Sequence, residues 1–206
     1  MATFWDRIAG LYDLAGRCNR RANAEAVRRV AAEISPGARV LDCAAGTGKF
    51  SLAAAERAGK VLCTDLSEAM LDRAFLKAKR LGRTNLAFEV RDLLCLPDRD
   101  GAFDAVIAAN VLHLLSRPEQ AVAELWRVVR PGGKLILPTY LQGEAGPGVR
   151  FLIRLYRLAG FSPKVQFTLG GYETFLRRCG LPEAAPTRIE GWLPVGLAVL
   201  TKPATI

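Results

Sequence analysis

The stretch from Val40 to Ala55 constrains the fold of this chain more than any other. It starts as a short apolar β-type run that ends in Asp42, continues through small residues that include Gly46 and Gly48, and then becomes helix-like. Small residues at a strand-to-helix turn let the backbone approach a ligand closely, and the start of the helix offers free N–H groups. The stretch predicts either a ligand-binding loop or a plain tight turn.

A second acid favours the ligand-binding interpretation. Asp65 closes another strand-like run about 20 residues after the loop, where nucleotide-binding folds place a carboxylate for ribose hydroxyls. The glycine spacing does not suit a dinucleotide, because Ser51 stands where a third glycine counted from Gly46 belongs, and Asp42 has no place in that pattern. A nicotinamide-dependent oxidoreductase is therefore disfavoured.

An ordered series of motifs resembles a known family. The segment Val40–Gly48 is similar to the first motif, usually D-x-G-x-G-x-G, of the Rossmann-like (class I) S-adenosylmethionine-dependent methyltransferases. Ala44 stands at the first glycine of that motif, and we expect it in an ordinary strand-end conformation where a Cβ costs nothing. The later motifs are matched in chain order by Asp65–Leu71, Val90–Leu93, Phe103–Asn110 and Arg130–Leu135.

The resemblance implies S-adenosyl-L-methionine as the cofactor and a set of residues that bind it. Gly46 and Gly48 would lie under the methionyl part, Asp65 would bind the ribose, and Asp92 would accept from the adenine amino group. The full set of expected cofactor-binding residues is Tyr12, Asp42, Ala44, Gly46, Thr47, Gly48, Asp65, Leu66, Met70, Asp92, Leu93 and Asn110.

The N-terminal stretch, residues 3–16, places aromatic and aliphatic side chains at helical spacing. One interpretation is a helix that docks on the core. The stretch also resembles the F-D-x-I-A-x-x-Y-D opening of the ubiquinone/menaquinone C-methyltransferases and their relatives. In that group the segment covers the cofactor, which would put Tyr12 at the methionyl end.

Strand-like and helix-like runs alternate along the chain and predict an α/β sheet with right-handed crossovers. With the resemblance, we expect a Rossmann-like three-layer sandwich whose mostly parallel, seven-stranded sheet closes with an antiparallel hairpin. Ser67, and Ser116 with Glu119, are expected to cap helices. We expect one methyltransferase domain over 1–206, divided into an N-terminal helical lid (1–36), a cofactor-binding core (37–142), an acceptor-side helical region (143–185) and a C-terminal hairpin (186–206).

Composition narrows the class of protein. The formal net charge of +9 suggests an acidic partner or substrate, or a basic balance without mechanistic meaning. No apolar run approaches the ~20 residues that span a bilayer, and no secretory leader opens the chain. Five cysteines without a C-x-x-C pair and a single histidine predict reduced thiols, a cytoplasmic location and no metal site.

Missing motifs limit the methyl acceptor. Asn110-Val111-Leu112-His113 follows the fourth strand in place of N/D-P-P-Y, so methylation of DNA adenine is disfavoured. No Pro-Cys dipeptide and no paired acids for magnesium are found, which leaves a small, lipophilic acceptor: a quinol, a phospholipid or a secondary metabolite. Nucleic acid is not the expected partner. A non-catalytic module that binds the cofactor or a partner stays open.

Two features carry the acceptor hypotheses. His113 is expected either to act as a base or to shape the pocket without taking a proton. The stretch Pro147–Phe161 has an apolar face and a cationic stripe of Arg150, Arg154 and Arg157. It is interpreted as a lid helix, or as a lid helix that also touches an anionic membrane.

Overall fold

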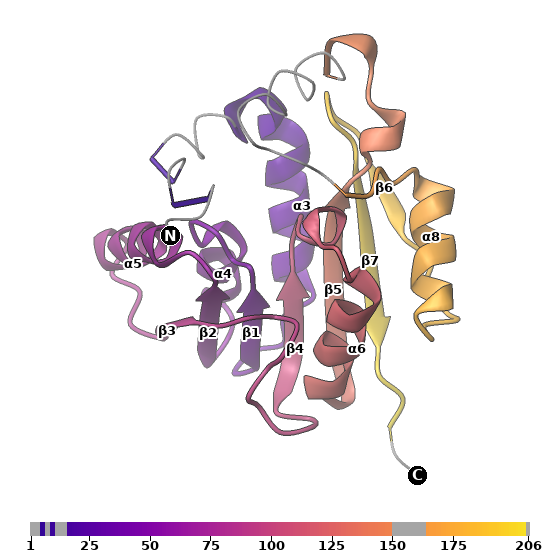
Figure 1. The fold of residues 1–206 in the computed structure, drawn as a ribbon. Helices are drawn as coiled ribbons and strands as arrows, with labels where there is room; N and C mark the ends of the chain where they lie inside the picture. Colours follow the sequence, from indigo (N-terminus) through magenta and orange to yellow (C-terminus); the bar gives the residue numbers. More distant parts are fainter. Residues whose placement is uncertain (1–4, 7–8, 11–15, 150–163, 205–206) are drawn as a thin grey trace.

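The computed structural model describes residues 5–6, 9–10, 16–149 and 164–204. Tyr12 and the three arginines of the predicted cationic stripe lie outside this part of the chain. Within it, seven strands form one sheet in the order β3-β2-β1-β4-β5-β7-β6 (Figure 1). In chain order the strands are β1 Arg39–Cys43, β2 Lys60–Asp65, β3 Leu86–Val90, β4 Phe103–Ala108, β5 Val129–Tyr140, β6 Thr187–Ile189 and β7 Val195–Thr201.

The sheet is parallel from β3 to β5 and antiparallel at its closing edge. β1 lies between β2 and β4 in parallel register, and β4 continues in parallel to β5. β7 inserts antiparallel between β5 and β6, so that Val195 at its start pairs with Tyr140 at the end of β5. This topology confirms the predicted Rossmann-like sheet and its antiparallel hairpin.

Helices cover both faces of the sheet because neighbouring strand residues point to opposite sides. In β1, Val40 packs with α3 and α4, whereas Leu41 packs with α6 and α8. The α5 helix lies on the side of α3 and α4, since its Leu71 and Ala74 pack on Cys63 of β2. The helical elements are η1 Gly16–Asn19, α3 Arg20–Ala32, α4 Lys49–Ala54, α5 Glu68–Arg80, η2 Leu112–Leu114, α6 Pro118–Val128, η3 Gln142–Glu144 and α8 Leu169–Arg178.

The two predicted serine caps have different outcomes. Ser67 caps α5, and its hydroxyl accepts the N–H of Met70 at 3.2 Å, as predicted. The prediction for Ser116 is wrong, because α6 starts at Pro118 with Arg117 at the N-cap and no side-chain cap bond. Proline fixes φ for the first helical position and has no N–H to cap, so it sets the start of this helix.

Side chains from the start of α3 tie three distant elements together at the carboxyl end of β5. The amide of Asn19 donates to the carbonyl of Leu193 at 2.7 Å, and its oxygen accepts the N–H of Leu193 at 3.1 Å. The hydroxyl of Tyr140 donates to Asn23 Oδ1 at 3.0 Å. The start of α3, the β6–β7 turn and the end of β5 are therefore held side by side.

No helix among the described residues is long and apolar enough to cross a bilayer. The same part of the chain contains no group of three or more His, Cys, Asp or Glu side chains placed to hold a metal ion.

Candidate functional site

The loop between β1 and α4 adopts a backbone that favours glycine. Ala44, Gly46 and Gly48 all have positive φ, at 52°, 55° and 77°. A Cβ added to Gly48 would lie 2.8 Å from the Cβ of Ala74, so a side chain at this position would clash with α5. The loop therefore passes close to α5 and turns sharply into α4.

Ala44 overturns the expectation of an ordinary strand-end conformation. Its φ of 52° lies in the left-handed region, where a Cβ costs roughly 1–2 kcal/mol because it crowds the following carbonyl. Glycine would avoid this cost, which is the physical reason for a glycine at this position of the motif. The natural alanine is strained at the turn where the chain leaves β1.

Asp65 joins the glycine loop to the end of β2. Its Oδ2 accepts the N–H of Gly46 at 2.8 Å, and its Oδ1 accepts the N–H of Ser67 at 2.9 Å. Burial raises the pKa of Asp65 above its ordinary value, these bonds oppose the rise, and the nearby charge of Asp6 adds to it. Each carboxylate oxygen has two lone pairs, so the group keeps acceptor capacity for hydroxyls of a ligand.

Asp42 is fully buried beneath the loop. Its Oδ2 accepts a 2.5 Å hydrogen bond from the Ser51 hydroxyl, while its Oδ1 has no partner among the described residues. Burial raises the pKa of Asp42 to about 7; the bond from Ser51 opposes the rise and the charge of Asp65 adds to it. An unpartnered buried carboxylate oxygen is costly on its own, and it is suited to a cationic or hydrogen-donating ligand.

The next predicted residues divide into exposed and buried groups. Leu66, directly after Asp65, is 60% exposed, which is unusual for a large apolar side chain and offers an apolar surface to a ligand. Asp92 is exposed, and its Oδ1 accepts the N–H of Leu94 at 2.9 Å. The three remaining residues of this part of the site, Thr47, Met70 and Leu93, are buried beneath the surface.

The carboxyl ends of β4 and β5 carry the acceptor-side candidates. Asn110 has a φ of 54°, and its side-chain Oδ1 is buried without a partner in the described part of the chain. His113 is only 2% exposed; its Nδ1 lies 3.5 Å from the Thr139 hydroxyl and its ring 6.2 Å from that of Tyr140. Burial lowers the pKa of His113 to about 4, so the imidazole is neutral at neutral pH.

Comparisons with known proteins agree with this geometry. A family model described as a methyltransferase domain matches residues 40–133, which include the glycine loop, Asp65, Asp92 and Asn110. This part of the chain is therefore similar to a methyltransferase domain. The predicted resemblance to these enzymes is thereby confirmed, and the comparisons below extend it to the menaquinone group.

Two relatives of the methyltransferase domain are demethylmenaquinone methyltransferases. The protein of Renibacterium salmoninarum is 33% identical over 150 residues, which cover 71% of this chain and 61% of the relative. The protein of Deinococcus radiodurans is 41% identical over 143 residues, covering 63% and 56%. The chain thus spans less than two thirds of the length of these relatives. A solved S-adenosylmethionine-dependent methyltransferase from Aquifex aeolicus has a TM-score of 0.70 and 21% identity, with 94% and 97% of the two chains covered.

Two polar residues of the candidate site were not predicted from the sequence. Asp6 was missed, although its Oδ1 accepts a short hydrogen bond from the Ser67 hydroxyl beside Asp65. Ser51 was used only as evidence against a dinucleotide, whereas its hydroxyl binds Asp42. The serine in place of a third glycine was the one available signal for Ser51. Nothing in the spacing of Asp6 indicated its contact with Ser67.

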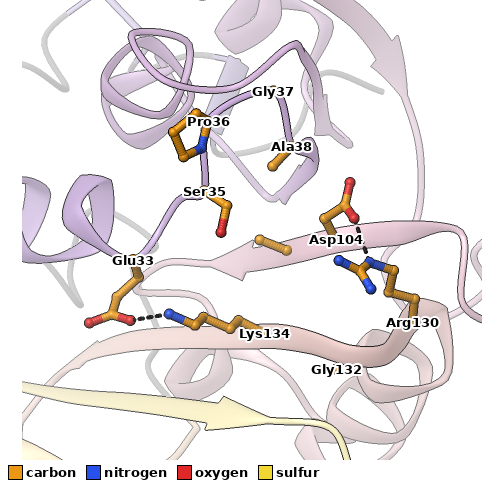
Figure 2. Close-up of a pocket in the computed structure, with 10 residues that line it drawn as sticks. Glu33, Ser35, Pro36, Gly37, Ala38, Asp104, Arg130, Gly132 and Lys134 are labelled. Atoms are coloured by element: carbon orange, nitrogen blue, oxygen red, sulfur yellow. Dashed lines mark hydrogen bonds and ion pairs between the residues drawn. The ribbon is translucent and has the colours of Figure 1, made fainter. Parts of the chain in front are cut away.

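Figure 2 shows a different pocket, at the opposite end of the sheet from the glycine loop. It has a volume of about 190 Å³ and is lined by the connection from α3 to β1, by the amino-terminal end of β4 and by β5. Its four charged side chains form two ion pairs, Lys134 with Glu33 at 2.7 Å and Arg130 with Asp104 at 2.5 Å. Because these charges balance, the pocket presents no net charge to a ligand.

Proposed function

We propose that this chain transfers the methyl group of S-adenosyl-L-methionine to a small, lipophilic acceptor of the quinol type. The observation that carries the proposal is the arrangement of three residues around the loop. Asp65 fixes Gly46, and beneath them Asp42 keeps a buried carboxylate oxygen unpartnered within the described chain. Relatives named for demethylmenaquinone support the quinol class. Phospholipids and secondary metabolites are the alternative acceptors.

The residues present fit this cofactor. Asp65 would accept from the ribose hydroxyls, the exposed side chain of Leu66 would pack on the adenine, and Asp92 would accept from the adenine amino group. The free oxygen of Asp42 would face the cationic methionyl part along the loop of Gly46. The bound cofactor supplies an activated methyl group on a sulfonium, so the protein mainly has to align the attacking atom, an effect worth up to roughly 7–11 kcal/mol.

We further propose that His113 orients the acceptor or takes its proton. Burial lowers the pKa of His113 to about 4, which keeps the imidazole neutral but also makes it a weak base, so its environment favours orienting the acceptor through a hydrogen bond over taking its proton. The contact between Nδ1 and the Thr139 hydroxyl would fix the orientation of the ring. Which of the two groups donates depends on the tautomer of His113. Asn110, whose side-chain oxygen has no partner among the described residues, lies on the same β4-to-η2 connection.

A cytoplasmic location belongs to the same proposal. All five cysteines are free in the structure, which supports a reducing compartment. The division of the chain into lid, core, acceptor-side region and hairpin is likewise retained as a proposal, with the lid and the acceptor-side region only partly within the described residues.

Calorimetry and turnover together test the proposal. S-adenosyl-L-methionine should bind wild type, and Asp65→Ala should weaken binding roughly ten- to hundredfold, since a lost charged hydrogen bond costs about 1.5–3 kcal/mol. Circular dichroism must show that the variant is folded, because Asp65 also holds the loop. Turnover is measured as S-adenosylhomocysteine formed with a short-chain demethylmenaquinol, followed by mass analysis of the product. Binding without turnover on any quinol, phospholipid or metabolite extract would favour a non-catalytic module.

The His113→Gln variant tests the acceptor-side proposal. It should lower turnover and leave cofactor affinity nearly unchanged, the pattern of a group that acts only in the transition state. Glutamine keeps hydrogen-bonding capacity but cannot take a proton at neutral pH. Wild-type turnover at both saturating and limiting acceptor would return His113 to a packing role.

A further inference from the structure

We propose that Arg20, Arg21 and Trp192 form a surface, the Trp192 surface, that docks this chain on an anionic membrane. The inference rests on the proposed function in one respect, because a lipophilic acceptor resides in a bilayer. The residues come from two elements far apart in sequence, the start of α3 and the turn between β6 and β7.

Hydrogen bonds hold the two elements together and keep the surface rigid. Asn19 makes two bonds with the backbone of Leu193, at 2.7 and 3.1 Å. A Cβ added to Gly191 would lie 2.5 Å from the Cβ of Ala22, so the turn packs directly on the first turn of α3. Trp192 lies between these two contacts in the turn. The turn that carries Trp192 is therefore held against the start of α3, which carries the two arginines.

The exposed side chains are of the kinds that bind membrane interfaces. Trp192 is 48% exposed, although it is a large aromatic residue, and Arg20 and Arg21, in the first turn of α3, are exposed as well. Tryptophan is amphipathic and settles at the level of lipid headgroups, while arginines are attracted to anionic lipid. Neither arginine has an ion-pair partner among the described residues. The surface therefore combines an apolar anchor with two unmatched positive charges.

Among the described residues, the acids of the neighbouring elements are already paired with other arginines. Glu144 and Glu190 both pair with Arg188, the latter at 2.6 Å. Glu25, further along α3, is held by Arg28 and Arg29, each at 2.7 Å. The complementary partner is therefore an anionic surface.

The Trp192 surface lies at the same end of the sheet as the candidate acceptor site. β7 starts just after the turn and pairs with the carboxyl end of β5 through Val195 and Tyr140 (Figure 1). Tyr140 binds Asn23 of α3 and lies against His113. Docking through this surface would bring the carboxyl end of β5, and with it the His113 region, towards the headgroups from which a lipophilic acceptor enters.

Vesicle co-sedimentation tests the proposal on the full chain. Wild type should bind phosphatidylcholine vesicles that contain phosphatidylglycerol and should dissociate from them in high salt. It should not bind vesicles of pure phosphatidylcholine. Each arginine near an anionic surface contributes about fivefold in partitioning, so Arg20→Gln with Arg21→Gln should weaken binding about 25-fold. Trp192→Ala should also weaken it, and the blue shift of tryptophan fluorescence on vesicle addition should be lost.

A matched control removes the same charge elsewhere. Lys79 and Arg80 are exposed at the C-terminal end of α5, away from the site, and lack ion-pair partners in the described chain. Lys79→Gln with Arg80→Gln should bind vesicles nearly as wild type does. If both double variants lose vesicle binding to the same extent, the attraction is an unspecific effect of charge and the proposal is overturned. Vesicle binding as strong as that of wild type in the Arg20/Arg21 variant would also overturn it. Binding to RNA but not to vesicles would overturn it as well.

The membrane-docking proposal and the methyltransferase proposal can fail independently of each other. The Arg20/Arg21 variant should bind S-adenosyl-L-methionine and methylate a water-soluble, short-chain acceptor as wild type does, and lose turnover only on acceptor embedded in vesicles. Vesicle binding by a wild type that binds no cofactor would leave the docking surface standing and remove the methyltransferase proposal. If wild type turns over the cofactor but does not bind anionic vesicles, the methyltransferase proposal stands and the docking surface is refuted.

Discussion

At the scale of single residues, Asp42 carries the most consequential charge of the candidate site. Its carboxyl is completely buried, one oxygen is bound by Ser51 and the other has no partner in the described chain. Burial raises its pKa to about 7. With the folded pKa above the unfolded one, stability from the protonated group is complete below the unfolded pKa and is lost as pH rises through about 7.

Without a ligand, burial favours the protonated form of Asp42. A cationic ligand next to it should favour the ionised carboxylate instead. We expect the affinity for S-adenosyl-L-methionine to increase about tenfold from about pH 6 to about pH 8, with proton release at the lower pH. Calorimetry in buffers of different ionisation enthalpy measures both effects. Asp42→Asn should bind with little pH dependence and release no proton; an unchanged pH profile in that variant would remove Asp42 from the coupling.

Ala44→Gly is the second residue-scale prediction. The alanine has a φ of 52°, so glycine would relieve a cost of roughly 1–2 kcal/mol and give back about 0.4–1 kcal/mol through a more flexible unfolded chain. We expect the free energy of unfolding to increase by up to about 1 kcal/mol, measured by urea denaturation, with cofactor affinity nearly unchanged. The matched control is Ala45→Gly, a neighbour without positive φ, which should not stabilise. A loss of stability in Ala44→Gly would refute the strain.

Ala44 shows which feature of a single residue could not be predicted from the sequence. The motif placed Asp42, Gly46 and Asp65 at one end of neighbouring strands, and the structure brings them together there. The backbone angle of Ala44 could not be derived, because a positive φ in a non-glycine residue is held by the surrounding fold and has no local signature. The contact between Asp6 and Ser67 was equally hidden, since 61 residues separate them.

At the scale of elements, strands were easier to predict than helix starts. The apolar run Leu86–Val90 predicts a strand, and β3 has those bounds. β5 begins at Val129, because Pro131-Gly132-Gly133 interrupts the register beside β4 without ending the strand. Ser116 matched a capping pattern, but Pro118 fixed the start of α6 two residues later.

The two serines provide an element-scale test. Ser67→Ala should lower the free energy of unfolding by about 1 kcal/mol, because α5 loses the bond to the Met70 N–H and Ser67 also loses its bond to Asp6. Ser116→Ala is the matched control and should be neutral within about 0.5 kcal/mol, since this exposed serine caps nothing. Equal losses in both variants would show that Ser116 caps α6 in solution.

At the scale of the whole molecule, the order of the motifs decided the fold more than any single motif did. Alternating strands and helices indicate an α/β sheet, but the antiparallel insertion of β7 between β5 and β6 follows from the resemblance and not from periodicity. The net charge of +9 indicated an anionic partner without placing it. The placement needed the fold, which joins the start of α3 to the β6–β7 turn through Asn19.

The last prediction concerns the stability of the whole chain. A ligand that binds only the folded protein stabilises it by about 2.7 kcal/mol at 100 times its Kd, which for a chain of this size raises Tm by roughly 5–10 °C. S-adenosyl-L-methionine should produce this shift in differential scanning calorimetry at constant pH. Asp65→Asn, with affinity about tenfold lower, should show about half the stabilisation at the same ligand concentration. NAD is the control: with Ser51 at the third-glycine position it should cause no shift, and a shift equal to that of S-adenosyl-L-methionine would indicate a dinucleotide site.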